Sequence, residues 1–326
     1  MDVIVRRHWK FSLTALIAMV VGALAAALVT GAAADAHPKP STAAQQLGDP
    51  DYGVCRGTNP ACYHDWGNFD LTQGVKVLLY TRTAGPRHQN LGPALAPGLN
   101  PPLTDANAAQ KGVMALGAKY GFTVDYTEDL AQLASPNNLF KYNAVIFLST
   151  SRDTLDDAAQ TSLRQYIRGG GGFVGIHNAF GTEYNFPWYE GLLGGANYYD
   201  HGPYQTGTVK TLTRRDSATR DLPSSWGYKD EWYNLVPFPS KVRFLATVDE
   251  DTLPSGSTGS MGHPGHGDFH PVAWCQYYDG GRSFLTTMGH GQTAFDPTSS
   301  DAGDQNFQKL IVGGILSAAG AKPFCQ

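Results

Sequence analysis

Apolar runs alternate with amphipathic stretches through the middle of the chain, and this order predicts alternating strands and helices. Strands are expected at residues 75–80, 122–127, 144–149 and 173–176. The third of these runs is continuously apolar, which is typical of a strand covered on both faces. Helices are expected from Thr104 or Asp105 to about Tyr120 and over residues 154–168. Strands and helices that alternate through short connections indicate a parallel, doubly wound sheet.

The pattern changes after about Val209, where strands follow one another with little helix between them. These strands are expected at residues 242–248, 272–278 and 283–288. The last two flank Asp279-Gly280-Gly281, a typical hairpin turn. A closing helix is expected at 307–318. Residues 71–320 are therefore interpreted as one three-layer α/β domain with a mostly parallel, doubly wound sheet and a late β-hairpin.

The N-terminal residues have the order of a secretory signal. Arg6, Arg7 and Lys10 precede an apolar run over 11–29, and Ala34-Asp35-Ala36 fits a signal peptidase site. We expect cleavage near His37 and secretion, with residues 1–36 as the signal peptide. The alternative is a retained membrane anchor, because the run is about long enough to span a bilayer. Residues 37–70, rich in Pro, Gly and Ala, are interpreted as an N-terminal arm.

Charge and cysteine content narrow the choice of partners and compartment. The net charge is −4, and no basic run follows the signal, so nucleic acid is not an expected partner. An exported chain with four cysteines favours disulfides. Cys55 and Cys62 bracket a turn-forming stretch and are expected to pair. Cys275 and Cys325 form the remaining pair, unless Cys275 is a buried thiol.

The most informative segment is GGGFVGIHNAFG, which ends a predicted strand at His177. In open α/β sheets, ligands bind beyond the carboxyl ends of the strands. Hydrolases of related topology place a nucleophile on a sharp elbow at such a position, but this position holds neither Ser nor Cys. His177 can act there as a general base, a metal ligand or a hydrogen-bond donor to a sugar. A purely structural histidine is the alternative.

Four further segments carry candidate chemistry. FPWYEGLLGG precedes His201, which lies in a Gly/Pro loop where its side chain is free to reach a site. In KDEWYNL, Glu231 stands among aromatic residues and is either paired or a working carboxylate. HPVAW begins a strand, and GGRSFLTTMGH ends one at His290. The aromatic residues are expected to be packing or pocket wall.

These five segments, in this order, resemble the ThuA-like (trehalose-utilisation) family over roughly residues 75–318. The resemblance implies a class I glutamine amidotransferase-like, or flavodoxin-like, fold in which the catalytic Cys is absent and His177 stands in its place. It also implies that His290 lies near the catalytic His of that superfamily, and that Arg87-His88 matches an Arg-His after the first strand. The family context implies sugar metabolism, often with keto-sugars. The signal peptide, the arm and the loop at 254–267 depart from the family and speak against a cytoplasmic trehalose role.

No cofactor is certain from the sequence, and a divalent metal such as zinc is an open alternative. Its candidate ligands are His88, His177, His201, Glu231 and His290, a mixed imidazole and carboxylate set. The spacing of His263, His266 and His270 also suits a metal. These three lie in a Gly-rich stretch, however, and we interpret it as a solvated surface loop.

The first functional hypothesis is an enzyme that acts on a carbohydrate or keto-sugar derivative by hydrolysis, elimination or isomerisation. His177 and Glu231 are expected to move protons, with His290 assisting catalysis. Substrate-binding residues are expected to be His88, His201, Asn178, and the rings of Trp188, Tyr189 and Trp274. One alternative is a non-catalytic, extracellular carbohydrate-binding domain. Another is an amidase-like hydrolase with a displaced nucleophile.

Overall fold

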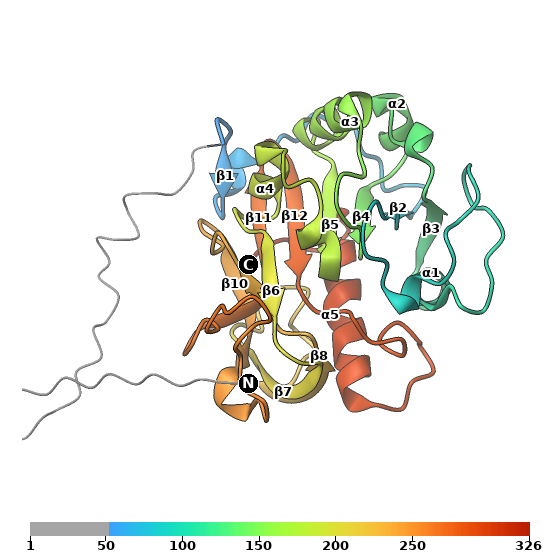
Figure 1. Cartoon of the computed structure of the whole chain (residues 1–326). Helices are drawn as coiled ribbons and strands as arrows, with labels where there is room; N and C mark the ends of the chain where they lie inside the picture. The colour runs from blue at the N-terminus through green and yellow to red at the C-terminus, as the bar shows by residue number, and fades with distance from the viewer. Residues whose placement is uncertain (1–51) are drawn as a thin grey trace, which may run out of the picture. The chain divides into compact units, whose positions relative to one another are not determined.

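The computed structural model describes residues 52–326, and its centre is a large mixed sheet (Figure 1). Five parallel strands form one half of this sheet in the order β3-β2-β4-β5-β12. They are β2 (Val75–Tyr80), β3 (Phe122–Thr127), β4 (Ala144–Leu148), β5 (Gly172–Ile176) and β12 (Gly281–Thr286). When these five strands are numbered along the chain, their order across the sheet is 2-1-3-4-5, which is the flavodoxin-like doubly wound arrangement.

Antiparallel strands extend the sheet beyond β12 in the order β11-β10-β7-β8. They are β7 (Gln205–Thr211), β8 (Ser225–Asp230), β10 (Arg243–Asp249) and β11 (His270–Tyr278). The hairpin between β11 and β12 turns at Asp279 and Gly280, which both have positive φ. The short strand β1 (Arg56–Gly57) also pairs with β11. A separate two-stranded sheet joins β6 (Tyr198–His201) to β9 (Tyr233–Leu235).

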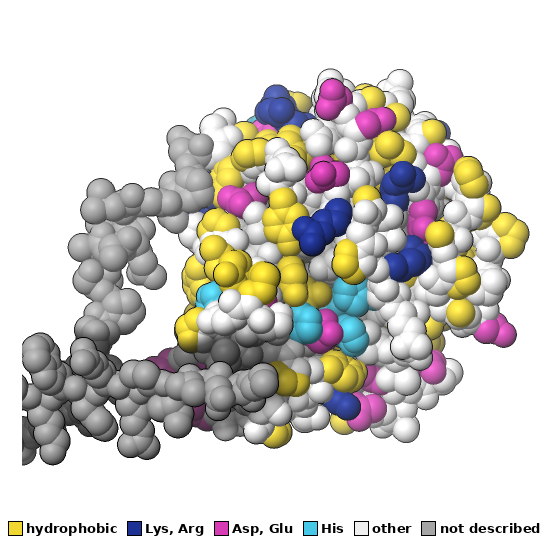
Figure 2. Space-filling view, in the orientation of Figure 1, with side chains coloured by type: hydrophobic (Ala, Val, Ile, Leu, Met, Phe, Trp, Pro, Cys, Tyr) yellow, Lys and Arg dark blue, Asp and Glu magenta, His cyan; other side chains and the backbone are white. Residues whose placement is uncertain are grey.

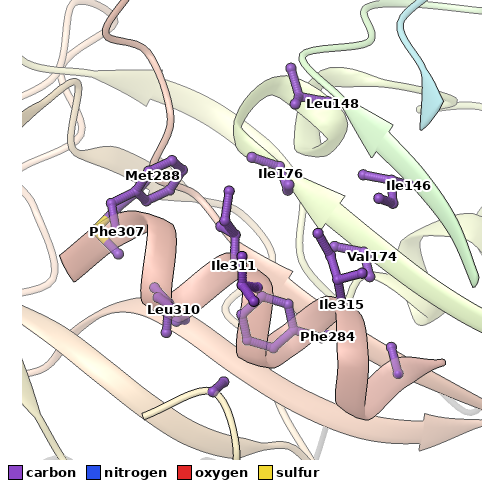
Figure 3. Close-up of a cluster of buried hydrophobic side chains, with 14 of the residues drawn as sticks. Ile146, Leu148, Val174, Ile176, Phe284, Met288, Phe307, Leu310, Ile311 and Ile315 are labelled. Atoms are coloured by element: carbon purple, nitrogen blue, oxygen red, sulfur yellow. The ribbon is translucent and has the colours of Figure 1, made fainter. Parts of the chain in front are cut away.

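Helices cover both faces of the parallel strands. Alternate side chains of each strand point to opposite faces, so Val77 and Leu79 pack with α1 (Ala108–Tyr120) and α5 (Ala302–Ala318). Figure 3 shows this side of the core, with Ile311 and other apolar residues of α5 against β4 and β5. Leu78 belongs to the opposite cluster, which contains residues of α2 (Pro136–Leu139), α3 (Asp157–Arg168) and α4 (Pro187–Leu192). The predicted three-layer α/β fold with its late hairpin is confirmed.

Short 3-10 helices occur in the connections. They are η1 (Pro60–Cys62), η2 (Gln89–Leu91), η3 (Leu130–Gln132), η4 (His177–Gly181) and η5 (Glu250–Thr252).

The predicted helix boundaries differ from the observed ones for local reasons. Helix α3 begins at Asp157 rather than at 154, because the backbone N–H groups of Thr154 and Leu155 donate to Glu183 Oε1 at 2.6 and 2.8 Å. Asp156 then caps the helix by accepting from Ala159 N. The closing helix α5 begins earlier than predicted, since Asp301 accepts hydrogen bonds from the first helical turn.

Both expected disulfides, Cys55–Cys62 and Cys275–Cys325, are formed. Such bonds are typical of proteins that fold in an oxidising compartment. The signal-peptide and anchor interpretations concern residues 1–36, which lie outside the described residues. Within residues 52–326, no helix combines the length and apolar character needed to span a bilayer.

Candidate active site

Four of the predicted site residues follow the ends of strands that meet at one edge of the sheet. His88 lies in the connection after β2, His177 follows β5 directly, Glu231 follows β8 directly, and His290 lies beyond β12. The carboxyl ends of the parallel strands β2, β5 and β12 lie at the same end of the sheet. Glu231 reaches this point from β8, in the antiparallel half. His177 has φ of +53°, a left-handed conformation that is rare for a non-glycine residue. This is the sharp strand-to-helix turn that the sequence predicted, and strain of this kind is typical of functional positions.

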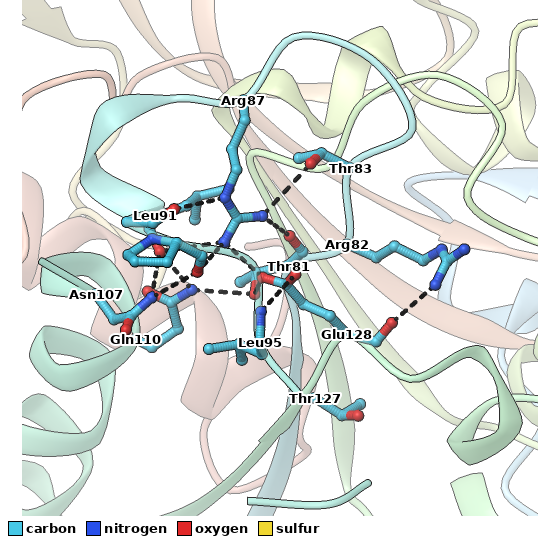
Figure 4. Close-up of polar contacts among 12 residues, drawn as sticks. Thr81, Arg82, Thr83, Arg87, Leu91, Leu95, Asn107, Gln110, Thr127 and Glu128 are labelled. Atoms are coloured by element: carbon cyan, nitrogen blue, oxygen red, sulfur yellow. Dashed lines mark hydrogen bonds and ion pairs between the residues drawn. The ribbon is translucent and has the colours of Figure 1, made fainter. Parts of the chain in front are cut away.

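Arg87 holds the loop that carries His88 (Figure 4). Its guanidinium pairs with the buried Glu128 at 2.8 Å and donates to the carbonyls of Gly92 and Pro93 at 2.6 and 2.9 Å. Glu128 also accepts from Thr81 Oγ1 at 2.9 Å, which ties the loop to the end of β2. His88 is therefore fixed by the residue before it, and the long loop after β2 has a defined conformation.

Asp230 and Asn90 join the other segments of the site. Asp230, fully buried at the end of β8, accepts hydrogen bonds from Gly289 N at 2.7 Å and from Glu231 N at 2.8 Å. Burial raises the pKa of Asp230 to about 7, although the backbone N–H donors oppose the rise. Asn90 Nδ2 donates to the carbonyls of Gly289 and His290 at 3.0 and 3.2 Å. These contacts place His290 next to Glu231.

The imidazoles of this cluster and the Glu231 carboxylate lie close together. His177 Nε2 lies 3.0 Å from His88 Nε2 and 3.8 Å from Glu231 Oε2. Glu231 Oε2 is also 3.0 Å from His290 Nδ1 and 3.6 Å from His201 Nε2. One ligand atom from each of His88, His177, Glu231 and His290 can be chosen so that all four lie within 4.8 Å of one another.

Hydrogen bonds define the tautomer of His177. Its Nδ1 lies 2.9 Å from the carbonyl oxygen of Thr287, which can only accept, so Nδ1 carries the proton. The Nε2 lone pair therefore points at the cluster. Tyr233 stacks on the His177 ring with centroids 4.7 Å apart, and its hydroxyl lies 3.0 Å from the same Nε2. His177 thus directs an unprotonated Nε2 toward the cluster.

Burial and mutual charge shift the pKa values of these groups in opposite directions. Burial lowers the pKa of His88 to about 4, and it lowers the pKa of fully buried His177, with repulsion from His88 adding to the effect. Burial alone would lower the pKa of His290, but the adjacent Glu231 raises it. Burial likewise opposes ionisation of Glu231, while His290 and His201 outweigh it and lower the pKa of that carboxyl.

A pocket of about 260 Å³ opens directly over this cluster. His88, Asn178, His201 and Glu231 line it, together with Tyr233. The remaining wall is formed by Tyr184, Tyr198, Ser151, Arg152, Pro86 and Gly181. Figure 2 shows histidine side chains gathered around an acidic one on this face of the molecule. The cluster can therefore be reached by a small molecule from solvent.

Three predicted substrate-binding aromatics are not at the pocket. Trp188, Tyr189 and Trp274 are buried in the core on the α3 side of the sheet. Their polar atoms are satisfied there: Trp274 Nε1 donates to Leu193 O at 3.0 Å, for example. The interpretation that these rings stack on a sugar is corrected, because the apolar area of each ring is used in packing between the sheet and α4.

The histidines of the 254–267 region are also placed differently from the prediction. His270 is fully buried at the start of β11 and contacts Glu250 Oε1 at 2.6 Å and Tyr233 O at 2.9 Å. His266 Nε2 accepts from Leu235 N at 2.9 Å. Most residues of the 254–267 loop are exposed, as predicted, but His266 attaches the loop to β9 and His270 belongs to β11. Likewise, His201 lies on strand β6 and not in an irregular loop.

Sequence reasoning missed the pocket residues Tyr233, Tyr184, Tyr198, Ser151 and Arg152. The signal for Tyr233 was present, since it stands two residues after Glu231 in the same aromatic segment. Arg152 has φ of +62°, and its guanidinium lies 5.7 Å from the Tyr184 ring. No pattern in the sequence marks Tyr184, Ser151 and Arg152, because they come from connections, and Tyr198 begins the short strand β6, which was not predicted.

Comparison with known proteins assigns the chain to a family. The family model described as trehalose utilisation, ThuA, matches residues 76–318. This chain belongs to the ThuA family. Among solved structures, a ThuA-like protein of Bacteroides uniformis has 23% identity and a TM-score of 0.55, over 79% of this chain and 96% of its own. A ThuA-like protein of Parabacteroides merdae has 19% identity and a TM-score of 0.53, over 77% and 92%.

A third structure, a cytoplasmic protein of Salmonella typhimurium LT2, has 11% identity and a TM-score of 0.51, over 75% of this chain and 99% of its own. No functionally curated protein matches the chain. At these identities the likeness shows a shared fold alone, and function has to be argued from the site.

Proposed function

We propose that this ThuA-family protein is a secreted enzyme that acts on a carbohydrate or keto-sugar derivative by hydrolysis, elimination or isomerisation. The observation that carries the proposal is the pocket over the His88–His177–Glu231–His290 cluster. Its volume of about 260 Å³ is below the roughly 300–1,000 Å³ typical of drug-sized ligands. It therefore suits a single small polar ring, and the rest of a longer substrate would stay in solvent.

The pocket walls support a polar, ring-shaped substrate. Tyr184, Tyr198 and Tyr233 offer rings that combine an apolar face with a hydroxyl. Asn178, Ser151 and Arg152 offer groups that can hydrogen-bond substrate oxygens. The family's association with trehalose utilisation points to the same class of substrate. Secretion is supported by the two disulfides and by the signal-like residues 1–36.

Glu231 is the first choice for the group that moves a proton, because it faces the pocket and contacts three imidazoles. A keto group acidifies the neighbouring C–H bonds, so proton removal there starts both elimination and isomerisation. Hydrolysis instead needs a proton delivered to the leaving oxygen. His201 lines the same wall, 3.6 Å from Glu231, and can accept or deliver that proton. His177 is fully buried beneath His88, so it acts through His88 and not on substrate directly.

The test is turnover of keto-disaccharides and of the matched unoxidised sugars by residues 37–326, with products followed by NMR. Glu231→Gln preserves the shape of the side chain and is expected to lower kcat at least about 100-fold, the effect typical of losing a general acid or base. His64→Gln is the matched control, because His64 lies outside the pocket lining and the cluster, and its ring stacks on Trp66. Sugar binding in calorimetry with no product from any substrate would instead favour a non-catalytic carbohydrate-binding domain.

A further inference from the structure

The separations between the four clustered atoms match the ligand spacing of a transition-metal ion. Two ligand atoms that each lie about 2.1 Å from an ion, at the tetrahedral angle, are about 3.4 Å apart. The separations at His177–His88, His177–Glu231 and Glu231–His290 are 3.0, 3.8 and 3.0 Å. These values bracket the expected spacing. The widest separation is within 4.8 Å, so up to about 1.4 Å would have to be closed by side-chain rotation when the ion binds.

The direction of the nitrogen atoms also fits a metal ligand set. Histidine ligands commonly donate their second ring N–H to a carbonyl or carboxylate, which fixes the tautomer. His177 does so through Nδ1 to Thr287 O, at 2.9 Å, and its Nε2 faces the cluster. His201, at the edge of the cluster, has the same arrangement, with Nδ1 2.6 Å from Gly202 O.

Hydrogen bonding among the described residues leaves the cluster incompletely satisfied. His290 Nδ1 is buried and lies 3.0 Å from Glu231 Oε2, yet the two do not meet at hydrogen-bonding angles. His177 Nε2 has a single lone pair but two neighbours at 3.0 Å, His88 Nε2 and the Tyr233 hydroxyl. A buried polar atom without a partner is costly. An ion placed between these groups would satisfy the nitrogen lone pairs and the carboxylate together.

We propose that His88, His177, His290 and Glu231 bind one divalent first-row transition-metal ion, with zinc the first candidate. Three imidazoles and one carboxylate are ligands that suit zinc and its neighbours and do not suit magnesium or calcium. His177 lies under the site, whereas His88 and Glu231 reach the pocket wall, so the ion would lie at the pocket floor. A bound ion there would polarise a substrate oxygen as a Lewis acid. With Glu231 occupied as a ligand, His201 on the pocket wall would be the group that moves the proton.

The metal test uses tag-free residues 37–326, stripped with a chelator and titrated with Zn²⁺, Mn²⁺ or Co²⁺ by calorimetry. Metal content is measured by elemental analysis after dialysis. We expect one ion per chain and a visible absorption band with Co²⁺. Glu231→Gln and His290→Gln are expected to weaken binding by at least about 100-fold, more than the 10–100-fold typical when a group that only orients a ligand is lost. Circular dichroism checks that both variants are folded.

The matched control is His263→Gln, in the second histidine group, where ring centroids of His263 and His266 are 4.8 Å apart. This variant is expected to bind the ion like the unaltered protein. Weaker binding in His263→Gln with unaltered binding in Glu231→Gln would overturn the assignment, as would the lack of a stoichiometric site for all three ions. The two proposals are separable: a bound ion without sugar turnover overturns only the proposed function, and turnover by a protein that has no stoichiometric site for any of the three ions overturns only the metal site.

Discussion

The contact between Arg87 and Glu128 offers a quantitative test of how the loop that carries His88 is held. Only 19% of the Arg87 side chain and 8% of the Glu128 side chain are exposed, and the two are 2.8 Å apart. Arg87→Met keeps much of the apolar stem but removes the charge and the donors to the carbonyls of Gly92 and Pro93. The substitution leaves the buried Glu128 carboxylate with the neutral donors Thr81 Oγ1 and Leu95 N and without its ion-pair partner.

The expected loss of folding stability in Arg87→Met follows from this burial. Removing one partner of a buried ion pair typically costs about 3–5 kcal/mol, because the remaining charge is uncompensated. For a domain of this size, 1 kcal/mol corresponds to roughly 2 °C in Tm, so Arg87→Met should unfold about 6–10 °C lower. The double variant Arg87→Met with Glu128→Gln should be more stable than Arg87→Met by at least about 1 kcal/mol, since it removes the unpaired buried charge of Glu128.

Urea and thermal unfolding of the single and double variants test this reasoning. Arg82→Met is the control, because this exposed arginine only donates to the Glu128 backbone carbonyl, at 3.3 Å, and should change stability by less than about 0.5 kcal/mol. If Arg87→Met stays within 1 kcal/mol of the unaltered protein, or if the double variant is no more stable than Arg87→Met, the loop is not held by this pair.

Two further predictions concern acid stability and the C-terminal disulfide. Although burial opposes it, the hydrogen bond from His270 lowers the pKa of Glu250 to about 2 from an unfolded value near 4.5. Glu250 therefore stabilises the fold above about pH 4.5 and progressively less as the pH falls toward 2. In urea titrations between these pH values, the unfolding free energy of Glu250→Gln should fall less steeply with pH than that of the unaltered protein. Replacing Cys275 and Cys325 by Ser removes a disulfide that closes a loop of 50 residues. Chain entropy predicts that the free energy of unfolding falls by about 4 kcal/mol, and an unchanged urea midpoint would contradict this.

Several elements could be predicted closely because their signals are local. β2 and β3 have the predicted bounds, since each is a short run rich in β-branched and aromatic residues that begins directly after a Gly. The strands β6, β7, β8 and β9 were missed. β7 and β8 contain Gly and alternate buried with exposed positions, and β6 and β9 are only three or four residues long. Such strands are stabilised by the neighbours they pair with and not by their own composition.

The chain's own sequence determined the parallel α/β fold, the Cys55–Cys62 pair and the polar groups at two strand ends, His177 and His290. These follow from periodicity and from the rule that ligands meet the carboxyl ends of parallel strands. Only the tertiary structure decided that Tyr233 lies on His177 and that Trp274 packs in the core, away from the pocket. Side-chain direction at these positions depends on contacts between segments far apart in the chain, and no local pattern in the sequence records those contacts.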